Sequence, residues 1–155
     1  MTPKDAQEKI EPLIALEVHS DAFPFKKTLE DLFGLVFLPL ERKEDGRGIY
    51  GQSSLTLVKE LKVTGVNSSY LDSSENRTFE VKKSIQIEIV NLVIYLAQEA
   101  TKEFAWNELK QLLKSKHPES QKFNVTYLKI AKDEVVGFKA VGQRDDVFQA
   151  IDKFI

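Results

Sequence analysis

An acid and a lysine two positions apart are the residues of this sequence whose types and spacing come nearest to a catalytic set. Glu80 and Lys82 lie in the segment FEVKK, and Asp72 is the acid that precedes them. The same Glu-x-Lys pattern recurs at Glu60 and Lys62. Residues two apart on a strand share one face. The repetition therefore favours opposite charges on solvated strand faces over a catalytic set.

The Glu80–Lys82 pattern, with Asp72 upstream, resembles the active site of the PD-(D/E)XK nucleases. The resemblance implies that both acids bind Mg²⁺ and that the lysine assists the attacking water, whose pKa the metal lowers. A turn at 73–76, however, places the two acids three residues out of register, about 10 Å along a strand. A Mg²⁺-dependent nuclease is therefore the alternative function, in which Glu80→Ala would abolish cleavage and leave the fold intact.

The sequence offers few residues suited to other kinds of catalytic or metal-binding site. The chain has no cysteine, which excludes disulfide scaffolds, zinc–thiolate sites and cysteine catalysis. The two histidines, His19 and His117, lie at predicted helix ends without a clear third ligand. We therefore expect no catalytic residues, no metal site and no cofactor, with Mg²⁺ implied only by the nuclease alternative.

The predicted elements form a single α+β domain over residues 1–155, in the order α-α-β-β-β-α-β-β-α. We expect an antiparallel sheet of about five strands packed against helices. Residues 1–20 form an N-terminal helical arm that begins at Thr2-Pro3 and is kinked or split at Pro12. A second helix is predicted from Ser20 to Gly34. The last quarter is predicted as two strands, 123–130 and 135–141, and a helix.

Two segments alternate between apolar and polar residues and are predicted as long strands, 55–63 and 79–89. Residues 84–96 also fit a helical period, so strand and helix both stay open there. We prefer a strand to about Val90, followed by a helix that Asn91 caps. A further helix, 104–116, carries Trp106 on its apolar stripe.

Composition argues for an ordinary globular chain. Of the 155 residues, 42% are hydrophobic, and 22 basic residues nearly balance 24 acidic ones. The small net charge of −2 excludes binding to nucleic acid through bulk charge. The most apolar segment, 85–96, is too short for a membrane span, which needs about 20 residues. With no export signal in view, we expect a cytoplasmic protein that does not contact membranes.

The preferred function is binding to another protein, as an accessory, chaperone-like or immunity-type module. A sheet edge or a helix face would make the contact, and a second copy of the chain is one candidate partner. From Pro24 onward, the order of elements is similar to that of small acidic dimeric secretion chaperones. The candidate contact residues are two aromatics at a helix entry and three residues of the later helix: Phe23, Phe25, Trp106, Lys110 and Lys114.

Overall fold

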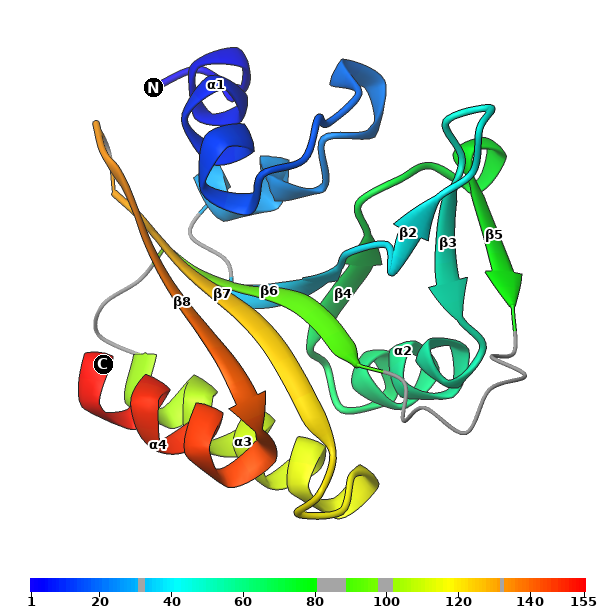
Figure 1. Cartoon of the computed structure of the whole chain (residues 1–155). Coiled ribbons are helices and arrows are strands. Elements are labelled where there is room, and N and C mark those ends of the chain that lie inside the picture. Colours follow the sequence, from blue (N-terminus) through cyan, green and yellow to red (C-terminus); the bar gives the residue numbers. More distant parts are fainter. Residues whose placement is uncertain (31–32, 81–88, 98–101, 132) are drawn as a thin grey trace.

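A five-stranded mixed sheet forms the centre of the structure (Figure 1), a computed structural model that describes residues 1–30, 33–80, 89–97, 102–131 and 133–155. The strand order is β4-β1-β6-β7-β8. Two neighbouring pairs, β1–β4 and β6–β7, are parallel, and the other two are antiparallel. The strands are β1 (Phe33–Phe37), β4 (Asn67–Tyr70), β6 (Val90–Leu96), β7 (Lys122–Ile130) and β8 (Val135–Gln143).

The predicted α+β class is confirmed, whereas the predicted antiparallel sheet is only partly right. Parallel pairs arise because α3 (Lys102–Lys116) separates β6 from β7, and such a crossover lets consecutive strands run in the same direction. The C-terminal hairpin of β7 and β8 follows its prediction closely, because its two strands are joined by a tight turn.

A smaller three-stranded sheet packs beside the first, in the order β2-β3-β5. Its strands are β2 (Glu41–Arg42), β3 (Gly48–Gly51) and β5 (Arg77–Glu80). The turn between β2 and β3 contains Gly46 at φ 90°, a left-handed conformation that favours glycine. The 3₁₀ turn η3 (Ser74–Asn76) leads into β5.

Helices cover both faces of the large sheet (Figure 1). On one face, α2 (Ser53–Val63), α3 and α4 (Arg144–Phe154) bury apolar residues against the sheet, among them Leu61, Leu109 and Phe148. On the other face lie α1 (Pro3–Ile14) and the 3₁₀ segments η1 (Ser20–Ala22) and η2 (Pro24–Glu30). Because apolar side chains are buried on both sides, the central strands β1 and β6 are almost fully apolar.

The N-terminal arm begins where the sequence predicts. Thr2 and Asp5 form a capping box, and Pro3 stands at the first helical position. The predicted split at Pro12 is not seen, because this proline lies in the last turn of a continuous α1. The predicted helix from Ser20 to Gly34 is replaced by the short η1 and η2.

The predicted strand over 55–63 is wrong, because this segment is the helix α2. Its buried residues are Ser54, Leu57, Val58 and Leu61, the i, i+3, i+4, i+7 spacing of a helix face. The apparent alternation was interrupted at Val58 and Lys59, and that interruption was the helical signal. Leucine, glutamate and lysine also favour helices intrinsically.

Of the ambiguous segment 84–96, the structure describes residues 89–96. Residues 90–96 form β6, so the predicted helix capped by Asn91 is wrong. Of the predicted strand 79–89, Phe79 and Glu80 belong to β5, and residues 81–88 lie outside the described residues. β6 is held between β1 and β7 on both sides, and this tertiary pairing decides for the strand.

No helix within the described ranges is both long and apolar enough to span a bilayer.

Candidate functional site

The outer edge of β8 is the longest strand edge that the described structure leaves unpaired. β8 has nine residues and pairs with β7 alone among the described strands (Figure 1). The opposite edge of the sheet is the four-residue β4, and the edges of the small sheet are two and four residues long. A long unpaired edge presents a row of backbone donors and acceptors to another chain.

The hydrogen bonds that flank the hairpin show which backbone groups of β8 point outward. The Ala131 N–H donates to the Glu134 carbonyl oxygen over 2.8 Å, and the Arg144 N–H donates to the Gln121 carbonyl oxygen over 2.8 Å. In an antiparallel pair, hydrogen-bonded positions alternate. The unbroken β7–β8 register therefore bonds the even-numbered residues of β8 to β7. The odd-numbered residues direct their N–H and C=O groups outward: Val135, Gly137, Lys139, Val141 and Gln143.

Apolar side chains flank this edge on both faces of the sheet. On the α4 face, the Phe138 ring stacks on Phe154, with centroids 4.7 Å apart and planes 14° apart. On the α1 face, Leu13 packs closely against Gly137. Val136 and Val141 are 41% and 67% exposed. Exposed apolar groups beside an unpaired edge are typical of a surface that binds another chain.

Asp72 lies in a buried polar cluster that joins the small sheet to the end of β4. The Arg42 guanidinium donates to its Oδ1 over 3.0 Å, and the Tyr50 hydroxyl donates to its Oδ2 over 2.6 Å. Arg77 donates to the Asp72 carbonyl oxygen over 2.9 Å. Burial, followed by the adjacent carboxylate, raises the pKa of Tyr50, which stays a neutral donor. The Asp72 side chain is 2% exposed, and both of its oxygens are occupied.

The two acids of the nuclease alternative do not converge. The Asp72 carboxylate lies over Gly48 of β3, whereas Glu80 pairs with Gly51, three residues further along. That offset corresponds to about 10 Å. Glu80 is 48% exposed and faces the Lys43 ammonium at 3.4 Å. Lys82 lies outside the described residues, and within those residues no three His, Asp or Glu side chains gather as a metal site.

Most of the predicted contact residues are buried. Phe23 and Phe25 are 5% and 0% exposed and pack in the core under α1. Trp106 is 2% exposed; its ring meets Phe148 edge-on, and its indole N–H donates to Asp152 over 2.6 Å. These three aromatic side chains form packing contacts within the fold and do not present a free surface.

The two predicted lysines differ in their surroundings. Lys110 is bound to Asp152, with an Nζ–Oδ1 distance of 3.1 Å, and its side chain is only 17% exposed. Lys114 is exposed on α3. Of the two lysines, Lys110 is therefore already paired within the chain.

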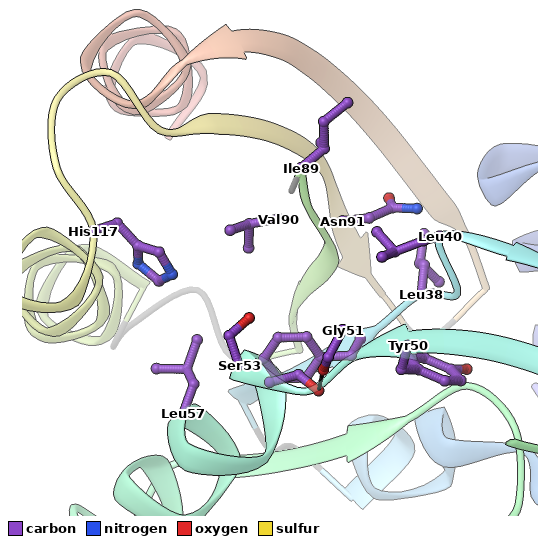
Figure 2. Close-up of a pocket in the computed structure, with 12 residues that line it drawn as sticks. Leu38, Leu40, Tyr50, Gly51, Ser53, Leu57, Ile89, Val90, Asn91 and His117 are labelled. Atoms are coloured by element: carbon purple, nitrogen blue, oxygen red, sulfur yellow. Dashed lines mark hydrogen bonds between the residues drawn. The ribbon is translucent and has the colours of Figure 1, made fainter. Parts of the chain in front are cut away.

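A small pocket opens between the start of α2, the start of β6 and the end of α3 (Figure 2). His117, Asn91 and Tyr50 contribute to its lining. The pocket offers about 30 Å³ to the centres of water-sized molecules. That is room for roughly two waters.

His117 itself packs edge-on against Phe123, and its Nδ1 lies 3.0 Å from the Leu113 carbonyl oxygen. Burial lowers its pKa below the usual 6.5, so the unfolded chain takes up this proton at a higher pH than the folded one. The neutral His117 imidazole therefore makes its full contribution to the free energy of unfolding above about pH 6.5. That contribution is lost as the pH falls toward the folded-state pKa.

When the pH is lowered from about 7.5 to about 5.5, we predict that the free energy of unfolding falls less in His117→Gln than in the wild type. Urea titrations at the two pH values measure this difference. The control is His19→Gln, because His19 is exposed; this variant should keep the wild-type pH dependence. Equal pH dependence in His117→Gln and the wild type would contradict the assignment.

A wider hollow of about 700 Å³ lies between α3 and the neighbouring ends of α2 and β1. Its lining includes Phe33, Val66 and Leu112, and Phe104 at its rim is 71% exposed. Glu108 is the one charged residue among its described lining residues. The hollow thus lacks a described acid–base pair, and its apolar lining suits contact more than catalysis.

Sequence reasoning missed the residues that define the β8 edge, although it predicted the strand. The missing information was the strand order, which depends on pairing between distant segments. The available signal was that the strand carries valines, Val136 and Val141, five residues apart and therefore on opposite faces.

Comparisons with known proteins assign no relatives to this chain: no family model, no curated protein and no solved structure matches it.

Proposed function

We propose that this protein is a non-enzymatic binding module that adds a strand of another polypeptide to the outer edge of β8. The supporting observation is the row of outward N–H and C=O groups from Val135 to Gln143, flanked by apolar side chains. In strand addition, such backbone groups supply affinity and the flanking side chains supply specificity. A chaperone-like or immunity-type role would use this mode of contact.

Lys139 fits this role because it limits unselective pairing. It is the one charged residue of β8, and it is exposed. A lysine on an edge strand disfavours aggregation with arbitrary strands. A correct partner must therefore place a small or acidic residue opposite this ammonium.

We predict that Lys139→Pro removes binding at this edge and preserves the fold. The Lys139 N–H points away from β7, so its loss breaks no bond inside the chain, and proline is tolerated at such edge positions. A partner strand loses one hydrogen bond and meets the proline ring, which should weaken binding at least about tenfold. The protein is immobilised and exposed to extracts of the cells that naturally express it. The measurement is the amount of each protein that it captures from these extracts.

The matched control is Lys139→Ala, which removes the charge and keeps the backbone N–H. Proteins bound at the edge should be captured by the wild type and by Lys139→Ala, and lost with Lys139→Pro. Circular dichroism should show the same fold for all three chains. Capture of the same proteins in equal amounts by Lys139→Pro would refute the proposal.

A further inference from the structure

We propose that the strand bound by β8 is β8 of a second copy of this chain, in an antiparallel pair centred on Phe138. The inference rests on the proposed function, since it names the occupant of the same edge. The resulting dimer would contain one continuous sheet made from the large sheets of both copies. The evidence is the pattern of outward groups, charge and exposed apolar side chains along β8.

Symmetry restricts how two β8 strands can pair. A two-fold axis that makes a continuous antiparallel sheet is perpendicular to that sheet, so each side chain stays on the same face in both copies. One residue must then face itself across the axis. Within the strand, only the centres 138, 139 and 140 leave at least seven of the nine residues of β8 paired, and in each case the outward odd-numbered residues bond to odd-numbered residues.

The side chains of β8 distinguish these centres. Centring on Lys139 places two ammonium groups directly opposite each other, which is destabilising. Centring on 140 leaves Val135 and the exposed Val136 without partners in the strand, whereas centring on Phe138 leaves only Gly142 and Gln143 without them. Centring on Phe138 places Lys139 opposite Gly137 and Val141 opposite Val135.

The Phe138-centred register also buries the exposed apolar groups. Phe138 would face its own copy as a non-hydrogen-bonded pair, in which the Cα atoms approach to about 4.5 Å and the side chains are closest. Its ring is already stacked on Phe154, which is 38% exposed, so four aromatic rings would meet across the axis. On the other face, Val141, 67% exposed, would lie beside Val135 and near Leu13 of the second copy.

Backbone pairing adds to this apolar contact. The pairs Val135–Val141 and Gly137–Lys139 each occur twice by symmetry. Each pair exchanges two N–H···O bonds, so the interface would contain about eight backbone hydrogen bonds. The exposed Val136 would face Ala140 of the second copy on the α4 face. Four of the five outward residues of the edge, Val135 to Val141, and both exposed valines are thereby matched by the same strand in the other copy.

Sedimentation equilibrium of the full chain tests the dimer. We expect the wild type and Lys139→Ala to sediment as dimers and Lys139→Pro to sediment as a monomer. The dimer dissociation constant of Lys139→Pro should be at least about tenfold higher than that of the wild type. A monomeric wild type at all concentrations, or a dimer that Lys139→Pro leaves unchanged, would overturn the inference. If a monomeric wild type still captures another protein that Lys139→Pro loses, the inference fails and the proposed function stands.

Cysteine crosslinking tests the register, because the natural chain has no cysteine. A mixture of Val136→Cys and Ala140→Cys chains should form intermolecular disulfides, since these positions face each other as a non-hydrogen-bonded pair. Either variant alone should not crosslink, because like positions lie four residues apart in register. Crosslinking of Lys139→Cys alone, without crosslinking in the mixture, would contradict the Phe138-centred pair.

Discussion

Replacing Asp72 with alanine is expected to lower the free energy of unfolding by about 3 kcal/mol, since it removes one partner of a buried ion pair. Arg42 would keep a charge with no carboxylate, and the Tyr50 hydroxyl would lose the acceptor 2.6 Å away. The Arg42 side chain is 28% exposed and can recover some hydration. The loss should therefore lie at the lower end of the range for such changes, about 3–5 kcal/mol.

Urea unfolding followed by fluorescence of the single tryptophan measures this loss. The matched control is Asp45→Ala, which breaks an ion pair to Arg47 whose side chains are 53% and 43% exposed. An exposed pair contributes little, so the control should lose far less stability than Asp72→Ala. If Asp72→Ala were as stable as Asp45→Ala, the polar cluster would not be the link between the two sheets that we describe.

Trp106→Ala is expected to cost about 3–5 kcal/mol of stability, the usual cost of removing a buried aromatic ring. The ring is 2% exposed and packs edge-on against Phe148 at 5.5 Å. The substitution also leaves Asp152 without the indole N–H that it accepts. Because the variant lacks the single tryptophan, thermal or urea unfolding is followed by circular dichroism.

The control for Trp106 lies two residues earlier on the same helix. Phe104 is 71% exposed, so Phe104→Ala should change stability by no more than about 0.5 kcal/mol. This comparison also separates a core residue from a binding anchor. A Trp106→Ala chain with wild-type stability and weakened partner binding would restore Trp106 as a contact residue and contradict its place in the core.

Local patterns predicted the elements whose faces are set by sequence-near residues. The stripe of Trp106, Leu109 and Leu113 predicted α3 because the helix buries one face. The C-terminal hairpin was predicted because its two strands are joined by a tight turn. α2 was misassigned because a short run of alternating leucines satisfies both periods, and only the packing of Leu57 and Leu61 decides between them.

The site depended on pairing that the sequence does not display. β8 is an edge because β7 pairs with β6 on its other side, and β6 was ambiguous between strand and helix. Likewise, Asp72 became a buried structural residue through Arg42 and Tyr50, which are 30 and 22 positions away. An acid beside a Glu-x-Lys pattern does not reveal such partners.

Residue-resolved amide hydrogen exchange along β8 most directly tests whether its outer edge binds a strand. We predict that the Gly137 and Val141 amides gain protection as the protein concentration rises, or when extract of the expressing cells is added. The Phe138 and Ala140 amides, which bond to β7, should stay protected throughout. If the Gly137 and Val141 amides exchange freely under every condition, the edge binds nothing and the proposed function is wrong.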